Sequence, residues 1–565
     1  MNNAKISYNG LIDEAARFVE KLQLLDKSLW DKVIKVFDYG KFQKGWQGEY
    51  WGKLMRGGCM VYKYTESEEL YQTLTDAVKG LLACQDEEGR ISAYDKDYEL
   101  SDWDVWCRKY VMYGLMYYME ICKDENFKSE IMSSLIKHSD YIIEKIGREE
   151  GKKNITETST FWLGCNSSSI LRPYVMLYKL TNDKKYLDFA EYIISEGGIV
   201  GGNLIDIAYE DKLAPYQYPE VKAYETMSFF EGVFEYATLM KNERLIDACI
   251  KFGNKILKTD VTLIGATGCF DELFDNSTKK QVTYTSSHMQ ETCVTVTFME
   301  YMCRLLEYTG DAKYANAIEI SFYNAFLGAI NREFGNNDGL HFDSYSPILN
   351  NPRGLAVGGK QTLLDGSYYG CCAAIGSAGF GAITSMSAIQ CDKLVKINFY
   401  EKGEICLGRN EISVDTSYPF DGKIVLKVID AEASFKLALR IPEWCKNYSV
   451  SLNGNLENGY FVTDEAVSCG DTVILNLEMP FEIHHSEDFD SEVTDLFAVT
   501  RGPIVFATED YADSVFDEKK VYNHSFEGIT SNAVIENTDK KMVELHNYAS
   551  VGGDWSKKMT VWLKV

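Results

Sequence analysis

The sequence predicts a ring of paired helices of the (α/α)6 type, residues 1–390, packed against a C-terminal antiparallel β-sandwich, residues 391–565. Three observations support this fold class. A pattern of amphipathic helices repeats about every sixty residues through the first two thirds of the chain. After residue 391 the pattern changes to the apolar–polar alternation of half-buried strands. No stretch rich in proline, glycine or serine separates the two parts, so we expect them to pack firmly together.

The repeat consists of a polar turn between two amphipathic segments, closed by a large apolar residue. Threonine, asparagine or aspartate in such a turn can end one helix and cap the next. The apolar residue that follows can pack back on the partner helix, so each copy predicts a helical hairpin. The five turns span Tyr64–Leu70, Cys122–Phe127, Leu180–Tyr186, Met240–Leu245 and Tyr308–Tyr314.

Two further segments complete a set of six hairpins. Residues 10–24 carry Leu11, Ala15 and Phe18 on one helical stripe, and residues 372–390 are small and apolar. Six hairpins that close on themselves form a ring whose inner helices end at a central cleft. An open solenoid of stacked hairpins is the alternative. We prefer the closed ring, because the repeat stops near six copies and the composition then changes.

The segment after residue 391 is expected to form antiparallel strands. Apolar and polar residues alternate over 393–399, 423–428, 435–440 and 448–452. Asn453–Gly454 and Gly470–Asp471 are turn signals between such strands. We expect this part to be structural, to cover one end of the ring and to support a possible homodimer.

Composition restricts the partners and the compartment. The net charge of −26 disfavours nucleic acid and anionic membrane surfaces as partners. The first ten residues lack the apolar core of a signal peptide, and no long uncharged apolar run suits a membrane span. We therefore expect a cytoplasmic protein whose 15 cysteines are thiols or metal ligands. An aromatic content of 13% suits sugar rings, although most tyrosines should fill the core.

Two adjacent cysteines, Cys371 and Cys372, are flanked by glycines that permit a loop or a helix start. Such a segment could bring both sulfurs to one point. Upstream, Glu291 and Cys293 place a carboxylate and a thiol two positions apart, which is the same side of an extended segment. Together the four side chains would make a tetrahedral zinc site. Buried cysteines acting as small hydrophobic residues, or a vicinal disulfide, are the alternatives.

Glu272 lies in a glycine-containing loop, residues 266–275, among apolar neighbours. Desolvation by such neighbours raises the pKa of a carboxyl group, as a general acid near neutral pH requires. A zinc-bound cysteine is held as a thiolate and could attack an anomeric carbon. Glu272 would then protonate the leaving oxygen and later activate water. A solvated surface loop is the alternative.

Six stretches occur in a specific order: Trp46–Gly52, Leu81–Gly89, Glu291–Cys293, Thr309–Asp311, Leu439–Trp444 and Arg501–Val505. In this order they resemble glycoside hydrolase family 127, whose members include bacterial β-L-arabinofuranosidases. The resemblance covers nearly the whole chain. It implies a retaining mechanism with Cys371 as nucleophile and Glu272 as acid/base. It also implies a zinc ion bound by Glu291, Cys293, Cys371 and Cys372.

The chain departs from the family pattern beside the cysteine pair and in the expected sugar-binding shell. The family usually follows the pair with two prolines and an asparagine, whereas residues 373–375 are Ala-Ala-Ile. Where the arabinofuranosidases present histidines, this chain has Arg108 and Tyr218, so we expect the same chemistry on a different glycone. Arg108, Lys109 and Lys222 could bind a carboxylated sugar if they face the cleft; helix-surface charge is the alternative. Further candidates for sugar binding, or for core packing and capping, are Trp46, Glu49 and Trp106.

The sequence therefore predicts a zinc-dependent, retaining exo-glycosidase that acts on a short, imported oligosaccharide with a pentose-like glycone, which could be acidic. One alternative is a catalytically inactive carbohydrate-binding relative, which the altered residues after Cys372 favour slightly. The other is a different (α/α)6 sugar enzyme, such as a lyase, an epimerase or a uronide hydrolase. These enzymes need no thiolate cluster, so activity that survives Cys371→Ala would favour them.

Overall fold

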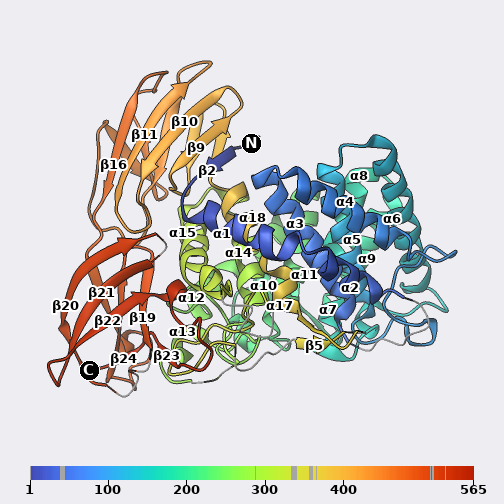
Figure 1. Ribbon diagram of the computed structural model, residues 1–565. Helices are drawn as coiled ribbons and strands as arrows, with labels where there is room; N and C mark the ends of the chain where they lie inside the picture. Colours follow the sequence, from blue (N-terminus) through green and yellow to red (C-terminus); the bar gives the residue numbers. More distant parts are fainter. Residues whose placement is uncertain are drawn as a thin grey trace.

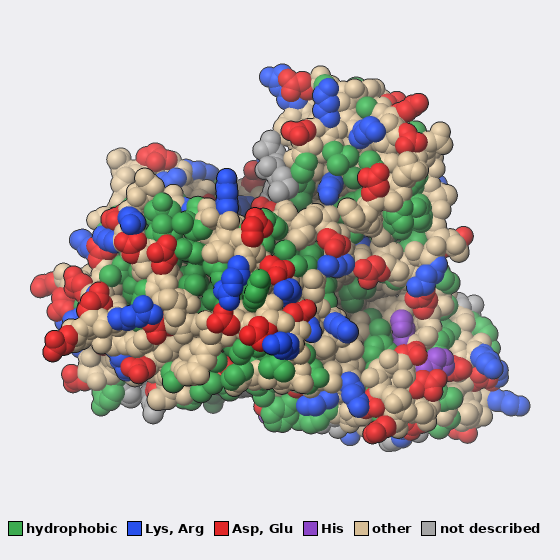
Figure 2. Space-filling view, turned by 180° about the vertical axis from the view of Figure 1, so that it is seen from behind, with side chains coloured by type: hydrophobic (Ala, Val, Ile, Leu, Met, Phe, Trp, Pro, Cys, Tyr) green, Lys and Arg blue, Asp and Glu red, His purple; other side chains and the backbone are tan. Residues whose placement is uncertain are grey.

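Helices occupy the first two thirds of the chain and strands dominate the remainder, which confirms the predicted order (Figure 1). The computed structural model describes residues 2–38, 45–284, 286, 288–332, 340–354, 360–363, 365–509, 511, 514–528 and 530–565. Within these ranges, no helix is both long and apolar enough to cross a membrane. On the face shown in Figure 2, acidic and basic side chains are interspersed rather than gathered by sign.

All five predicted turns join a pair of helices. The pairs are α3 (Tyr50–Thr65) with α4 (Glu68–Leu82), α5 (Asp104–Ile121) with α6 (Glu125–Lys145), α8 (Leu171–Thr181) with α9 (Lys184–Ser195), α11 (Ala223–Met240) with α12 (Glu243–Thr259), and α14 (Thr292–Thr309) with α15 (Ala312–Ser321). Shorter helices lie around and between the pairs: α2 (Lys27–Lys35), α7 (Cys165–Ser168), α10 (Leu204–Glu210), α13 (Ser277–Lys280) and α16 (Leu327–Ala329).

Capping explains why each turn ends one helix and starts the next. The Asp124 carboxylate accepts hydrogen bonds from the backbone N–H groups of Asn126 and Phe127, at 2.9 and 3.2 Å. These are amides that the first turn of a helix leaves without a partner. Gly310, with φ of 65°, ends α14 in the left-handed conformation that glycine adopts without strain. The N-caps of the other four hairpins are Ser67, Asp183, Asn242 and Asp311.

The inner helices form a closed ring rather than an open solenoid. Helices α3, α5, α8, α11 and α14 contact one another in this order, with α7 beside α5 and α11. Helices α17 (Cys371–Gly376) and α18 (Gly379–Ser385) contact both α14 and α3, and so close the ring. The approach of α17 to α3 depends on Gly57, where a Cβ atom would lie 1.9 Å from the Ser377 side chain. Helix α1 (Leu11–Val19) packs against α3.

The strand-rich part holds three large sheets. Two have six strands each, in the orders β1-β7-β8-β12-β15-β14 and β13-β16-β11-β10-β9-β2. The third has the order β17-β18-β19-β22-β21-β20, with β23 pairing β19 and β24 pairing β18. Neighbouring strands are antiparallel except for the parallel pair of β8 and β12. In Figure 1 the sheet that contains β9, β10, β11 and β16 lies above the eight-stranded sheet.

The strands of the six-stranded sheets are β1 (Asn2–Asn3), β2 (Lys5–Tyr8), β7 (Ala388–Cys391), β8 (Leu394–Ile397), β9 (Gly403–Leu407), β10 (Asn410–Thr416), β11 (Lys423–Asp430), β12 (Lys436–Arg440), β13 (Tyr448–Val450), β14 (Gly454–Glu457), β15 (Tyr460–Thr463) and β16 (Thr472–Leu477). The eight-stranded sheet contains β17 (Phe481–His485), β18 (Leu496–Arg501), β19 (Ile504–Glu509), β20 (Phe516–Glu527), β21 (Thr530–Asn537), β22 (Met542–Asn547), β23 (Met559–Thr560) and β24 (Leu563–Lys564). Small hairpins pair β3 (Gly198–Ile199) with β4 (Gly202–Asn203), and β5 (Lys360–Thr362) with β6 (Tyr368–Gly370).

The N-terminus also belongs to the strand-rich part. Strand β1 pairs with β7, and β2 pairs with β9, across nearly 400 residues of chain. The predicted division of the chain at residue 390 assigns these two strands to the ring and not to the sheets. A local sequence pattern carries no information on pairing between such distant segments. The division into two six-stranded sheets and one eight-stranded sheet is likewise invisible locally, since every strand alternates in the same way.

A buried ion pair joins the six-stranded sheet that contains β12 to the helical ring, in agreement with the expected firm packing. The Arg440 guanidinium contacts the Glu319 carboxylate, and both side chains are almost completely buried. Arg440 also donates a hydrogen bond of 2.6 Å to Asn316, and the Tyr418 hydroxyl donates one of 2.6 Å to Glu319. The stretch that contains Arg440 is therefore explained by contact between the two parts and not by the chemistry of a site.

Candidate metal centre and active-site cavity

The N-terminal ends of α14 and α17 bring the four predicted metal ligands together. Glu291 is the N-cap of α14 and keeps an extended backbone, while Cys293 lies in the first turn. Strand β6 ends at Gly370, and α17 begins directly with Cys371 and Cys372. At the start of each helix the backbone changes from extended to helical, which lets the two side chains of a pair converge. A regular helix or a regular strand would not direct both Glu291 with Cys293 and Cys371 with Cys372 to one point.

The ligand atoms form a compact cluster. The Cys293 and Cys372 sulfurs are 3.5 Å apart, and those of Cys371 and Cys372 are 3.8 Å apart. Glu291 Oε1 lies 3.4 Å from the Cys371 sulfur and 3.2 Å from the Cys372 sulfur. All four ligand atoms lie within 4.8 Å of one another, and all four residues are buried.

This donor set fits a zinc ion. Zinc–sulfur bonds of about 2.3 Å and zinc–oxygen bonds of about 2.0–2.2 Å place tetrahedral ligand atoms roughly 3.5–3.8 Å apart. The observed separations are close to this range. Glu291 Oε2 is buried without a hydrogen-bond partner, which a carboxylate tolerates poorly unless a cation binds it. At 3.8 Å the two adjacent sulfurs are too far apart for a vicinal disulfide, which needs about 2.05 Å.

The three thiols differ in their electrostatic environment. Burial raises the pKa of Cys293 and Cys372 well above that of a free thiol, and burial also raises the pKa of Glu291. The pKa of Cys371 is lowered well below the usual range, because Cys293 and Cys372 hydrogen bond to its sulfur and the Lys53 cation is near.

The cluster forms one wall of a cavity of about 240 Å³ at the N-terminal ends of the inner helices. Cys371 and Cys293 reach this cavity, and so does Glu272 from the loop before α13. Aromatic rings cover much of the remaining wall. The other lining residues are Trp46, Glu49, Lys53, Trp103, Trp106, Phe161, Trp162, Lys222, Tyr224, Glu225 and Glu291. Three of the five residues that were predicted to bind substrate, Trp46, Glu49 and Trp106, are among them.

Glu272 is paired with a cation instead of being surrounded by apolar groups. Its carboxylate contacts the Lys222 ammonium, and the Lys222 nitrogen lies 4.6 Å from the centre of the Trp162 ring. The Ala223 N–H donates a hydrogen bond of 2.9 Å to the Glu272 carbonyl, which fixes the loop to the start of α11. Phe270, expected beside the carboxyl group, is 43% exposed.

Arg108 and Tyr218 do not line the cavity, which corrects the prediction that they bind sugar. The Arg108 guanidinium is buried and donates hydrogen bonds to Asp104 at 3.1 Å and to Glu99 at 2.8 Å. Residues two positions apart on a helix point in different directions, so Arg108 faces away once Trp106 faces the cavity. Tyr218 is buried against Phe252, with ring centres 6.2 Å apart.

Lys109 is also outside the cavity lining, whereas Lys222 is part of it. The Lys109 nitrogen lies 3.3 Å from the centre of the Trp106 ring and donates a hydrogen bond of 2.9 Å to Ser169. Burial lowers the pKa of Lys109 well below its usual range.

Sequence reasoning missed several residues of the cavity wall. Lys53 follows Glu49 by four positions, and Trp103 precedes Trp106 by three, so helical spacing could have indicated both. The loop that carries Trp162 could not have been found, because it depends on two consecutive left-handed residues, Trp162 and Leu163. The missed residues are Lys53, Trp103, Phe161, Trp162, Tyr224 and Glu225.

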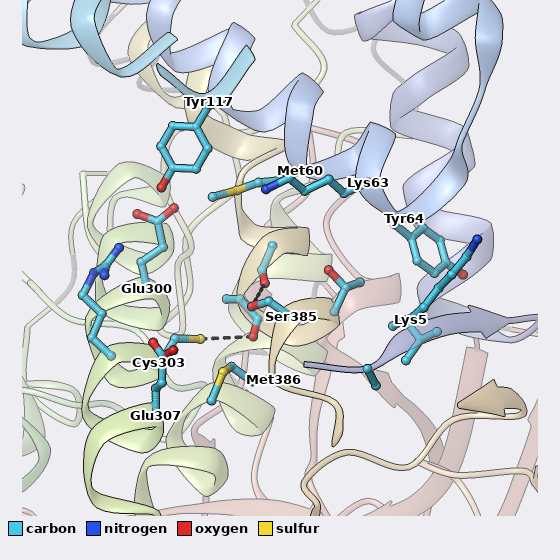
Figure 3. Close-up of a pocket in the computed structure, with 16 residues that line it drawn as sticks. Lys5, Met60, Lys63, Tyr64, Tyr117, Glu300, Cys303, Glu307, Ser385 and Met386 are labelled. Carbon is cyan, nitrogen blue, oxygen red and sulfur yellow. Dashed lines mark hydrogen bonds between the residues drawn. The ribbon is translucent and has the colours of Figure 1, made fainter. Parts of the chain in front are cut away.

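A second cavity, of about 410 Å³, lies at the opposite end of the ring (Figure 3). The C-terminal halves of α3 and α14 line it together with α18. Its cations are already engaged: Lys5 pairs with Glu66 at 2.8 Å, Lys63 contacts Glu120, and Arg304 pairs with a glutamate of α11 at 3.1 Å. We assign these charges to stabilisation of the fold.

Models of one known protein family match most of the chain. The family model described as "Beta-L-arabinofuranosidase, GH127 catalytic domain" matches residues 8–338, and that of the GH127 middle domain matches residues 394–479. The chain belongs to glycoside hydrolase family 127. It is therefore a glycoside hydrolase with a carbohydrate substrate, and the GH127 resemblance of the sequence is confirmed.

Solved structures of this family share the fold. A GH127 β-L-arabinofuranosidase from Geobacillus stearothermophilus T6 is 19% identical with a TM-score of 0.77, and the match covers 99% of each chain. A structure described as a GH127 β-arabinofuranosidase is 18% identical with a TM-score of 0.73, over 100% of this chain and 96% of the other. No curated protein matches the sequence.

Proposed function

We propose that this GH127 protein is a retaining exo-glycosidase in which Cys371 is the nucleophile and Glu272 the acid/base. The observation that carries the proposal is the cluster of Glu291 and three thiols at the wall of an aromatic cavity that Glu272 also reaches. A zinc ion on Glu291, Cys293, Cys371 and Cys372 would keep the thiols ionised at neutral pH.

The proposed reaction has two steps, transfer of the sugar to Cys371 and hydrolysis of the resulting intermediate. The Cys371 sulfur attacks the anomeric carbon, and a C–S bond forms as the bond to the leaving oxygen breaks. Glu272 gives a proton to that oxygen. Water then attacks the same carbon and Glu272 takes its proton, so the C–S bond breaks and the sugar leaves with its original configuration. Two inversions at one carbon explain the retention.

Cys371 suits the nucleophile better than the other two thiols. It is 7% exposed, whereas Cys293 and Cys372 have no exposed surface. The Cys293 sulfur also lies 3.7 Å from the Lys53 ammonium, which stabilises it in place as a ligand. Cys372 does not line the cavity. Access to the cavity therefore favours Cys371 as the nucleophile.

Replacement of Glu272 by glutamine tests the acid/base assignment. Loss of a general acid costs about 10²–10⁴-fold in rate. We expect a loss in this range for glycosides with a poorly acidic leaving group and a much smaller loss for nitrophenyl glycosides, whose leaving group needs no proton. The measurement is kcat/KM on a matched pair of such substrates.

Glu225→Gln is the matched comparison for this test. Glu225 lines the same cavity, and its Oε2 is buried without a hydrogen-bond partner. If Glu225→Gln shows the dependence on leaving group and Glu272→Gln does not, the acid/base role belongs to Glu225.

The cavity supports exo action on a small glycone. Its volume of about 240 Å³ ends at the buried cluster, which leaves room for little more than one sugar ring. At the outer wall, Phe161 is 41% exposed and stacks on Trp103 with ring centres 5.6 Å apart. Aromatic faces of this kind suit the apolar face of a sugar, so we place the leaving group here and a pentose-like glycone inside.

An acidic glycone is a second candidate, favoured by the presence of Lys222 in the cavity wall. Lys222 contacts Glu272, so a carboxylated sugar would have to replace Glu272 as its partner. Screening aryl furanosides beside acidic pentosides separates the two candidates. Hydrolysis of the acidic substrates that Lys222→Met abolishes, with neutral substrates unaffected, would establish the acidic glycone.

Metal content tests the proposal before any substrate is known. Protein purified without added zinc and without a metal-affinity tag is expected to contain about one zinc ion per chain, because four protein ligands complete a structural-type zinc site. Cys372→Ala should lose the metal, whereas Cys303→Ala, at the opposite end of the ring, should keep it. Absence of zinc from the wild-type protein would overturn the mechanism.

A further inference from the structure

Lys53 is a completely buried lysine on the inner helix α3. Its ammonium lies 2.8 Å from Glu49 Oε1 and 3.7 Å from the Cys293 sulfur. The ring of Tyr224 faces it with the centre 4.6 Å away, and that of Tyr110 with the centre 5.2 Å away. The cation is thus enclosed between one carboxylate, one metal-ligand candidate and aromatic faces.

Such a position is costly unless anions compensate for the lost hydration. Removal of an ammonium group from water costs several kcal/mol even after relaxation of the protein. Aromatic faces recover part of this cost. The groups in contact with the Lys53 ammonium that can carry a full negative charge are the Glu49 carboxylate and the Cys293 sulfur.

Glu49 holds the lysine in place and is itself held. One of its oxygens faces Lys53, and the other accepts a hydrogen bond from the Trp106 indole N–H. Both oxygens are therefore engaged, although Glu49 lines the cavity. The chain of contacts runs from Trp106 through Glu49 and Lys53 to Cys293. Chains of this kind orient metal ligands in proteins from outside the ligand set.

We propose that Lys53 is a positioning residue of the metal centre, which donates a charge-assisted hydrogen bond to the Cys293 thiolate and offsets the negative charge of the cluster. The inference rests on the proposed zinc site. Three thiolates and a carboxylate carry four negative charges against two on zinc, so the buried site has an excess of negative charge, and the Lys53 ammonium lies beside it. The contact is made to Cys293 alone among the ligands, which fixes Cys293 as a permanent ligand and leaves Cys371 to react.

Lys109, on the neighbouring inner helix α5, provides a matched control for the replacement of Lys53. It is also almost completely buried and also lies over the Trp106 ring, but its hydrogen bond goes to Ser169. Replacement of Lys109 therefore removes a buried lysine side chain of the same length without touching a ligand of the cluster.

The test is zinc affinity, measured by competition with a chromophoric chelator on purified full-length protein. Lys53→Met is expected to bind zinc about 10–100-fold more weakly, as is typical when a partner outside the ligand set is lost. Lys109→Met should stay within about twofold of the wild type. Lys53→Arg retains the charge and is expected to recover most of the affinity. In cobalt-loaded protein, Lys53→Met should shift the sulfur-to-cobalt charge-transfer band, because the Cys293 thiolate loses its hydrogen bond.

The outcomes separate the inference from the function on which it rests. Zinc in the wild type with unchanged affinity and an unchanged cobalt spectrum in Lys53→Met would overturn the inference and leave the proposed function standing. Absence of zinc from the wild type would overturn both. If Lys53→Met does not fold, Glu49→Gln is measured in its place, because it releases Lys53 from its anchor and should weaken zinc binding in the same direction.

Discussion

Replacement of Cys371 by alanine is expected to lower the rate of glycoside hydrolysis by about 10⁴–10⁶-fold, the range found when a covalent nucleophile is removed. No other sulfur can take its place, because Cys372 does not line the cavity and Cys293 lies against Lys53. The measurement is a single-turnover rate on an activated aryl glycoside. Mass spectrometry of quenched wild-type protein should reveal a glycosyl adduct on Cys371 that the variant lacks.

Two observations keep this test specific. Cys303→Ala should retain wild-type activity, because Cys303 lies at the opposite end of the ring. Cys371→Ala should bind zinc about as weakly as Cys372→Ala, since each variant keeps three of the four ligands, so the zinc content of both is measured beside the rate. Full activity in Cys371→Ala would contradict the proposal and favour an epimerase-like or uronide-hydrolase-like mechanism, which needs no thiolate. A wild-type protein that binds sugars with zinc present but hydrolyses none would favour an inactive relative.

Replacement of Arg440 by methionine is expected to have the largest effect on stability, with the free energy of unfolding reduced by about 3–5 kcal/mol. The substitution leaves the Glu319 carboxylate buried, 1% exposed, without its cation. Glu319 would keep the hydrogen bond from the Tyr418 hydroxyl, but that neutral donor does not balance the charge. Urea unfolding followed by circular dichroism measures the loss. The six-stranded sheets should then unfold in a transition separate from that of the ring.

The control is an ion pair on the surface. Arg409 and Glu432 are 3.0 Å apart, but their side chains are 79% and 64% exposed. Water already solvates both groups, so Arg409→Met should leave the unfolding curve almost unchanged. Equal losses for the two arginine variants would show that burial does not decide the contribution of Arg440.

The sequence predicted the helical hairpins well because their signals are local. A cap such as Asp124 acts on amides two and three residues away, and its effect depends little on the rest of the fold. The metal cluster was predictable for a related reason. Adjacent Cys371 and Cys372, and the pair Glu291 and Cys293, each place two candidate ligands within one turn of chain, so only one long-range contact had to be assumed.

The sugar-binding shell was predicted less well, because side-chain direction depends on how each helix is rotated in the ring. Trp106 and Arg108 are two positions apart, and the structure directs Trp106 to the cavity and Arg108 to Asp104. Helix α5 is buried on nearly all sides, so its sequence pattern does not indicate which face points into the ring. The sequence did not predict the ion pair between Lys222 and Glu272 for the same reason, although it indicated both residues.

The sequence by itself determined the order of ring and strands, the turns of the ring and the residues of the cluster of Glu291 and three cysteines, since each depends on short stretches of chain. Only the tertiary structure decided that the ring closes, that β1 and β2 join the distant sheets, and that Lys53 faces Cys293 across 240 residues. These features arise from packing between segments far apart in the chain. Their energy is collective, and no single stretch of sequence contains both partners.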